Sequence, residues 1–281
     1  HWAEQGNAGW GWSDVLPYFK RAENNERGAD DLHGTGGPLN VADLRSPNPL
    51  SHAFVQAGIQ AGYAHNNDFN GPEFEGVGLY QVTHKNGERF SAAKAYLTPH
   101  LASRSNLHVV TGAQVTRVLM EGKRAVGVQY FKGGALHSER ATREVLLSAG
   151  ALLSPQILML SGIGNGADLQ KLGISVVHDL PGVGEHLHDH PDVVTVVDGP
   201  QLTDSFGLSL KGAASLVGAA FEWNSKRTGM LTTNFAEAGG FIKSSDSEAV
   251  PDLQLHFVVG KLLDHGRSHS ATNANTRVQP L

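Results

Sequence analysis

The stretch 144–164 constrains the fold more than any other part of the chain, because an apolar run there passes through small residues into a helical pattern. Residues 144–148 (Glu-Val-Leu-Leu-Ser) predict a buried strand, and the small residues 149–151 follow as a turn. Ser154 as N-cap and Pro155 as first helical residue predict a helix after the turn. Small residues allow close backbone approach, and a helix N-terminus presents unpaired N–H groups, so this unit could lie beside a ligand. The residues alone also fit a buried strand, turn and helix that touch no ligand.

The uncharged run 145–167 also has the length of a membrane span. It contains glycines, a proline and an asparagine, which interrupt a continuous lipid-facing helix. We therefore expect no transmembrane segment here.

The hydrophobic period elsewhere predicts a mixture of helices and strands. Apolar runs separated by Gly-containing or polar turns predict a β-meander with strands at 107–110, 115–119, 125–131 and 144–148. Three- and four-residue steps predict helices at 13–22, with Ser13 as N-cap, and at 50–61, 91–101 and 210–221. Short strands are expected at 39–41, 193–197 and 253–257. The fold class is therefore α+β.

Composition excludes several classes of function. The formal net charge is −5 and no basic run follows the spacing of a phosphate backbone, so we expect no nucleic-acid partner. The chain has no cysteine, which excludes disulfides, thiolate catalysis and cysteine-ligated metals.

Residues 150–164 (Gly-Ala-Leu-Leu-Ser-Pro-Gln-Ile-Leu-Met-Leu-Ser-Gly-Ile-Gly) resemble the second signature of the glucose-methanol-choline (GMC) flavoprotein oxidoreductases at fifteen positions. Residues 12–23 resemble the family's W-x-x-x-x-P-Y-F-K-x-x-E segment. Further segments resemble the family in the expected order, at 68–71, 75–78, 86–91, 124–128 and 180–184. The likeness covers nearly all of residues 1–267 and is greatest to the branch of bacterial alcohol dehydrogenases and choline dehydrogenases.

The resemblance implies a partial FAD-binding domain, made of a β-meander and a strand–helix unit, with a mixed-sheet substrate-binding domain. It implies mixed substrate-domain and connecting segments over 1–105 and the later part of the FAD-binding domain over 106–190. The substrate-binding domain is expected over 191–267. Residues 268–281 are polar and without periodicity, so we expect a loose tail there.

FAD is the cofactor that the resemblance implies. Val115 occupies the position whose backbone pairs with the adenine in relatives, although the residue alone reads as an ordinary strand valine. Ser148, Ala149 and Gly150 lie where the chain passes the adenosine and the diphosphate. These four positions are the cofactor-binding residues that we expect.

Glu237 is a lone carboxylate among apolar and small residues. A buried anion needs a partner, and a quaternary ammonium headgroup is one candidate, since a Glu at this place is the headgroup anchor in choline-oxidising relatives. Hydrogen bonds from backbone N–H groups are the alternative. The resemblance implies oxidation of a primary aliphatic alcohol to an aldehyde, with choline as the alternative substrate. It also implies a quinone or respiratory electron acceptor and a location in the cytoplasm or peripherally on the inner membrane.

His186, His188 and His190 would share one face of a strand, a spacing that suits a three-histidine zinc site and a metal-dependent hydrolase. Relatives carry N-L-Q-D-H at this point, with amide residues at two of the three histidine positions. We therefore expect no metal, and the hydrolase remains a remote alternative.

Two parts of the family's chemistry are missing from the sequence. The dinucleotide fingerprint G-x-G-x-x-G after a strand does not occur, and the resemblance stops near Arg267, before the segment that carries the catalytic histidine in relatives. We therefore assign no catalytic residue. The chain reads as an internal piece of a flavoenzyme, and we expect it to be inactive alone and to have lost most of the anchoring of FAD.

Overall fold

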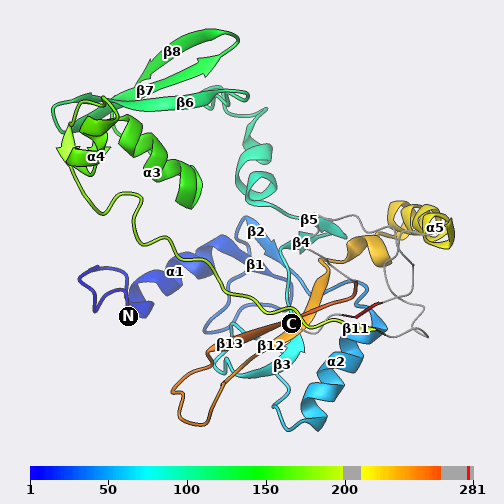
Figure 1. Ribbon diagram of the computed structural model, residues 1–281. Coiled ribbons are helices and arrows are strands. Elements are labelled where there is room, and N and C mark those ends of the chain that lie inside the picture. Colours follow the sequence, from blue (N-terminus) through cyan, green and yellow to red (C-terminus); the bar gives the residue numbers. More distant parts are fainter. Residues whose placement is uncertain (199–209, 261–276, 279–281) are drawn as a thin grey trace. The chain divides into compact units, whose positions relative to one another are not determined.

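The computed structural model describes residues 1–198, 210–260 and 277–278 (Figure 1). The chain divides into two compact units. The first unit contains His1–Ser105 and Asp192–Leu281, and the second contains Asn106–Pro191.

The first unit is built on an antiparallel sheet in which β12 (Ala236–Ile242) lies between β3 (Gly76–Leu79) and β13 (Leu253–Val258). The helix α2 (Pro49–Gln60) packs on this sheet. The alternation at 253–257 and the helical pattern at 50–61 predicted these two elements, and both predictions are confirmed.

The core of the first unit lies between α2 and the sheet. Val55 of α2 packs there with Ala238, Phe257 and Val259, all of which are buried. Phe54 stacks on Phe257 with ring centroids 4.8 Å apart. A mixed sheet was expected, but the three strands here are all antiparallel, and the parallel pairs among the described residues are short ladders elsewhere.

The other elements of the first unit are short, apart from two helices. They are α1 (Trp12–Ala22), β1 (Glu23–Asn25), β2 (Leu39–Val41), β4 (His84–Lys85), β5 (Glu88–Arg89), the π-helix η1 (Ala93–Leu97), the 3-10 helices η2 (Thr98–His100) and η3 (Met230–Thr232), β11 (Val197–Asp198), α5 (Leu210–Lys226) and β14 (Arg277–Val278). The strand predicted at 39–41 and the helix predicted at 210–221 are confirmed.

The N-terminus of α1 differs from the prediction. Gly11 is the N-cap in place of Ser13, because the Asp14 carboxylate accepts the Gly11 N–H at 3.0 Å and closes the first turn earlier. The helix predicted at 91–101 is present only as the irregular elements η1 and η2.

The second unit contains an antiparallel meander of β6 (Gln114–Glu121), β7 (Arg124–Lys132) and β8 (Ala135–Arg140). The helix α3 (Gly150–Leu160) packs on β6. Two short parallel strands, β9 (Ile163–Gly164) and β10 (His178–Asp179), flank α4 (Gly166–Lys171).

Two of the four predicted meander strands are wrong. Residues 107–110 and 144–148 form no strand, and within the described ranges no neighbouring strand pairs with either segment. A strand needs such a partner to satisfy its backbone groups, and apolar composition alone does not supply one. The third strand is instead β8, which follows the turn glycines Gly133 and Gly134 and has six exposed residues, so it carries no apolar alternation.

The start of α3 also corrects a prediction. The helix begins at Gly150, with φ of +85° at this residue, and Ser154 lies one turn inside it. The Ser154 hydroxyl accepts the N–H of Ala149 at 2.9 Å, so this serine stabilises the helix start from within. Pro155 stands in the helix interior, where it leaves the Ala151 carbonyl without its usual donor.

Three further expectations concern the C-terminal half and the membrane. The strand predicted at 193–197 is reduced to β11, which pairs antiparallel with β14. The loose tail predicted at 268–281 lies outside the described residues, apart from the two residues of β14. Within the described residues no helix is both long and apolar enough to cross a bilayer.

Candidate functional site

Glu237 is placed by an irregularity in β12. Ala236 pairs with Val258 and Ala238 pairs with Phe257, so Glu237 is the extra residue of a β-bulge. A bulge turns a side chain out of the regular alternation of its strand. The side chain of Glu237 is 2% exposed.

Three neutral donors surround the Glu237 carboxylate. Oε2 accepts the backbone N–H of Asn48 at 2.6 Å and the hydroxyl of Ser51 at 2.8 Å. Oε1 accepts the hydroxyl of Thr233 at 2.6 Å. The donors come from the N-terminal end of α2 and from the segment just before β12, so the carboxylate joins these elements. These contacts agree with the alternative in which hydrogen bonds from the protein itself stabilise the carboxylate. One of the three donors is a backbone N–H, as expected, and the other two are hydroxyl groups.

The residues expected to hold the cofactor all lie in the second unit. Val115 is half-buried in β6 opposite Tyr130, and the segment that contains Ser148, Ala149 and Gly150 leads into α3. Because α3 packs on β6, the two elements that carry these residues are neighbours.

The N-terminus of α3 has the chemistry that a diphosphate needs. Its first N–H groups lack partners within the helix, and the helix dipole favours an anion there. A side chain built at Gly150 would meet no atom within 4 Å, and Ser148 is exposed, so the backbone at this point is open to a ligand. The residues present therefore fit a nucleotide through backbone contacts, and no side chain of this segment adds a charge.

The three histidines considered for a metal do not share a strand face. Residues 185–190 have no strand structure, and His186 has a left-handed backbone with φ of +57°. In the part of the chain that the structure describes, no group of three or more histidine and carboxylate side chains is placed to hold a metal ion. The geometric basis of the hydrolase alternative is therefore wrong.

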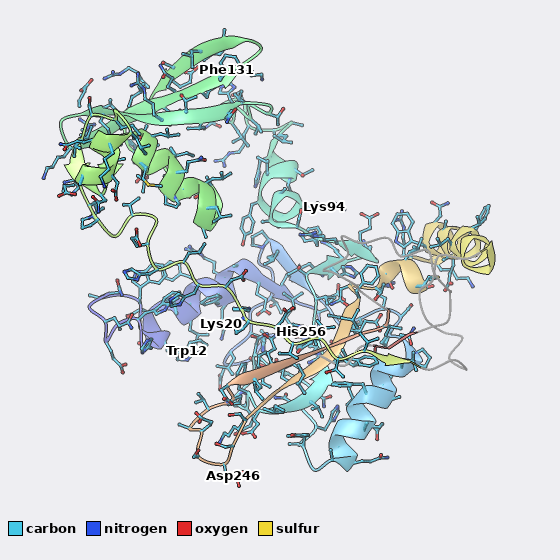
Figure 2. The ribbon with its side chains drawn as sticks, in the orientation of Figure 1. Trp12, Lys20, Lys94, Phe131, Asp246 and His256 are labelled. Carbon is cyan, nitrogen blue, oxygen red and sulfur yellow. The ribbon has the colours of Figure 1, made fainter. Side chains whose placement is uncertain are left out.

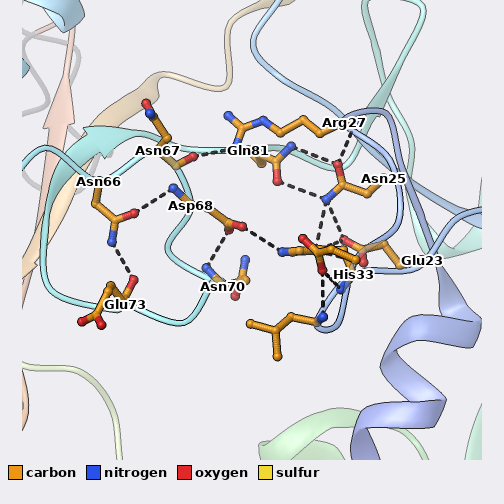
Figure 3. A network of polar contacts seen from close by, with 12 residues as sticks. Glu23, Asn25, Arg27, His33, Asn66, Asn67, Asp68, Asn70, Glu73 and Gln81 are labelled. Atoms are coloured by element: carbon orange, nitrogen blue, oxygen red, sulfur yellow. Dashed lines mark hydrogen bonds and ion pairs between the residues drawn. The ribbon is translucent and has the colours of Figure 1, made fainter.

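A polar network around His33 was missed by the sequence analysis (Figure 3). The His33 side chain is 8% exposed, and its ring lies between two carboxylates. Nδ1 is 3.1 Å from both Oε1 and Oε2 of Glu23, and Nε2 is 2.9 Å from Oδ2 of Asp68. Burial opposes the charged ring, but the hydrogen bonds and the attraction of Glu23 and Asp68 outweigh it, so the pKa of His33 is raised above its usual value. No local pattern signals this contact, since Asp68 is 35 residues from His33.

A groove of about 330 Å³ lies beside this network and is lined by Arg27, Asp43, His52, His65, Asn67 and Tyr80 among others. Arg27 is already engaged, because Nη2 pairs with Oδ1 of Asp43 at 2.7 Å and Nη1 donates to the Asn67 carbonyl at 2.6 Å. The groove therefore has no free cation at Arg27 with which to bind a ligand.

Solved structures share this fold. An FAD-dependent oxidoreductase from Chaetomium thermophilum is 27% identical with a TM-score of 0.77, over 86% of this chain and 44% of that one. A formate oxidase superposes with a TM-score of 0.83 at 22% identity, over 99% of this chain and 53% of that one.

Curated relatives have higher sequence identity. The alcohol dehydrogenase [acceptor] of Pseudomonas putida is 44% identical over 272 residues, which are 95% of this chain and 48% of the relative. The mitochondrial choline dehydrogenase of Homo sapiens is 45% identical over 269 residues, 95% of this chain and 44% of the relative. The chain thus spans about half the length of these relatives.

The model of the GMC oxidoreductase family matches residues 1–192, which is more than half of the chain. This match confirms the resemblance drawn from the fifteen positions at 150–164, and the expected FAD cofactor agrees with it. The chain belongs to the GMC oxidoreductase family.

Proposed function

We propose that this chain is part of an FAD-dependent oxidoreductase that acts on the CH–OH group of primary aliphatic alcohols and forms the aldehyde. The similarity to the alcohol dehydrogenase of Pseudomonas putida, 44% identity over 95% of this chain, carries the proposal. The electron acceptor that we propose is a quinone or another respiratory carrier. The proposed location is the cytoplasm or the periphery of the inner membrane.

FAD, when bound, supplies the acceptor for the hydride that leaves the alcohol carbon. The backbone of Val115 in β6 would hold the adenine, and Ser148, Ala149 and Gly150 would hold the adenosine and the diphosphate. The open backbone at the start of α3 supports this assignment, because the first N–H groups of a helix lack partners within the helix and favour an anion.

The environment of Glu237 favours an aliphatic alcohol over choline. An anchor for a quaternary ammonium group must present its charge to the ligand, ideally with aromatic neighbours. The Glu237 carboxylate is 2% exposed and already accepts three hydrogen bonds, from Asn48, Ser51 and Thr233. We therefore propose that Glu237 has a structural role and fixes the bulge of β12.

Choline is the second candidate substrate, because the human choline dehydrogenase is as similar to this chain as the alcohol dehydrogenase is. The two substrates are distinguished by the Glu237→Gln variant. The variant is made in a polypeptide that joins this chain to a dinucleotide fingerprint and a catalytic histidine segment. Selective loss of choline turnover would support choline, whereas an equal effect on choline and on a linear primary alcohol would support the structural role.

We also propose that the 281-residue chain alone does not oxidise alcohols, because its sequence contains no G-x-G-x-x-G fingerprint. The purified chain is expected to show no alcohol-dependent reduction of an artificial quinone. FAD that copurifies at about one equivalent and is reduced by alcohol would contradict this proposal.

A further inference from the structure

Two polar contacts join the loop 66–71 to the N-terminal part of the first unit. His33 Nε2 lies 2.9 Å from Oδ2 of Asp68, and Arg27 Nη1 donates to the carbonyl of Asn67 at 2.6 Å (Figure 3). Asn67 also lines the groove of about 330 Å³, so these contacts hold one wall of that groove. An arginine keeps its charge at every pH of interest, whereas an imidazole loses its charge near neutral pH. The contact at His33 is therefore the one that a change of pH can break.

The two oxygens of the Asp68 carboxylate have different partners. Oδ1 accepts the backbone N–H of Asn70 at 3.0 Å, a contact inside the loop, and Oδ2 contacts His33 Nε2. The Asp68 side chain is 29% exposed, so water can replace the imidazole without leaving a buried, unpaired charge. The next residue, Phe69, is buried, and its ring centroid lies 5.2 Å from that of Phe241. Phe69 therefore keeps the loop on the sheet when Asp68 turns away.

Glu23, on the other side of the ring, is held in place. Both of its carboxylate oxygens lie 3.1 Å from His33 Nδ1. Oε2 also accepts the backbone N–H of Gly34 at 2.9 Å, and Oε1 accepts Nδ2 of Asn25 at 3.1 Å. These contacts keep the Glu23 carboxylate in front of Nδ1 whether or not the ring is charged.

The amide of Asn25 does not replace a proton on Nδ1. Its Nδ2 lies 3.2 Å from Nδ1, but the two hydrogens of Nδ2 have acceptors in Oε1 of Glu23 and Oε1 of Gln81. The orientation of the amide is fixed, because its oxygen accepts the backbone N–H of Arg27 at 3.0 Å. A neutral His33 ring is therefore expected to keep its one proton on Nδ1, since an Nδ1 lone pair would face two carboxylate oxygens.

The charged groups around the ring come from every segment packed against it. Glu23 belongs to β1, Asp68 belongs to the loop, and Asp30 Oδ1 accepts the backbone N–H of His33 at 2.7 Å. Lys20 of α1, labelled in Figure 2, donates to the Asp30 carbonyl at 2.6 Å. Burial lowers the pKa of His33, but the hydrogen bonds and the charges of Glu23 and Asp68 outweigh burial and raise this pKa.

We propose that His33 is a pH-dependent switch for the loop 66–71. The cationic ring donates from Nδ1 to Glu23 and from Nε2 to Asp68. Deprotonation removes the proton from Nε2, and the Nε2 lone pair then repels Asp68 Oδ2, so the Asp68 carboxylate turns to solvent. The loop keeps its other contacts, and the wall of the groove that Asn67 forms becomes mobile.

The first test is ring-nitrogen NMR of the 281-residue chain with isotope-labelled histidine over a series of pH values. The His33 resonances are assigned by their absence from the His33→Gln variant. Above its titration, His33 is expected as the tautomer with the proton on Nδ1. The tautomer with the proton on Nε2 would overturn the proposal, because Asp68 would then keep its donor. A ring that stays charged up to the pH of unfolding would also overturn it.

The second test is hydrogen exchange at the backbone N–H of Asn70, corrected for the intrinsic effect of pH on exchange. Protection of this N–H is expected to fall about tenfold or more as His33 loses its proton, because the Asp68 carboxylate that accepts it moves away. The amides of α2 serve as the internal reference, and their protection is expected to show no such step. The step at Asn70 is expected to be absent from His33→Gln, in which the side chain does not titrate.

Asp68→Asn tests the same step from the side of the loop, because it removes the charge and keeps the size of the side chain. In this variant His33 is expected to titrate at lower pH, and the step at Asn70 is expected to disappear. The matched control is Asp31→Asn, an exposed carboxylate two residues before the ring, which is expected to leave both unchanged. An equal shift of the His33 titration in both variants, or a step at Asn70 that persists in His33→Gln, would overturn the proposal.

Discussion

The hydroxyl of Ser51 donates a hydrogen bond to the carboxylate of Glu237, with Oγ 2.8 Å from Oε2. Both residues are buried, and 186 positions of the chain separate them. The contact fastens the first turn of α2 to the bulge of β12, so it couples a helix from the start of the chain to a strand near its end.

Removal of this donor is expected to destabilise the first unit. Ser51→Ala leaves the buried Glu237 carboxylate with two of its three donors, so we expect the free energy of unfolding to fall by about 1 to 3 kcal/mol. Urea denaturation followed by circular dichroism measures the change. The control is Ser105→Ala, at an exposed position of the same unit, where we expect less than about 0.5 kcal/mol. Equal midpoints for the two variants would contradict the assigned role.

The pH dependence of stability is expected to follow His33. Its pKa is raised in the folded chain, so its contribution is fully present below the unfolded value of about 6.5 and is lost as the pH rises through the folded value. The difference in unfolding free energy between the parent chain and His33→Gln should therefore be largest in mildly acidic solution and shrink towards alkaline pH. Denaturation series at several pH values measure it. A difference that grows with pH would show that His33 is not held as a cation by Glu23 and Asp68.

The turn of the β4–β5 hairpin is expected to tolerate no side chain at Gly87. This glycine has φ of +70°, and a Cβ built there would lie 2.5 Å from the Arg227 carbonyl oxygen. Gly87→Ala should therefore destabilise the chain by more than the backbone strain alone, which is about 1 to 2 kcal/mol. Gly36→Ala provides the comparison, because Gly36 has φ of +78° and no atom within 4 Å of the added Cβ. Thermal melting of both variants separates the steric contact from the strain, and similar melting temperatures would contradict the close approach.

The sequence predicted those helices and strands whose own residues show a hydrophobic period. The helices at 50–61 and 210–221 were predicted from three- and four-residue hydrophobic steps and the strand at 253–257 from alternating apolar residues, and all three are present. The segment 144–148 is apolar but unpaired, since a strand depends on a partner that its own residues do not encode. The hairpin strand β8 is exposed along its length, so no apolar pattern reveals it.

The sites were less predictable because their partners are distant in sequence. Glu237 was singled out as a buried anion, yet its donors Asn48 and Ser51 lie almost 190 residues earlier. The β4–β5 hairpin is joined to α5 by a hydrogen bond from Trp223 Nε1 to the Gly87 carbonyl, between residues 136 positions apart. Neither juxtaposition has a signature in spacing or composition.

The open backbone at the start of α3 leads to a prediction about cofactor retention. Gly150 has φ of +85° and Gly133, in the turn between β7 and β8 of the same unit, has φ of +60°; neither has an atom within 4 Å of an added Cβ. Replacement by alanine therefore imposes a similar backbone strain at both positions, about 1 to 2 kcal/mol, without a steric contact inside the chain. If the backbone at Gly150 lies against FAD, Gly150→Ala should lower the flavin content of an enzyme that contains this chain and a dinucleotide fingerprint. Gly133→Ala should leave the flavin content unchanged. Flavin absorbance per polypeptide measures the difference, and equal occupancy in both variants would argue that the cofactor lies elsewhere.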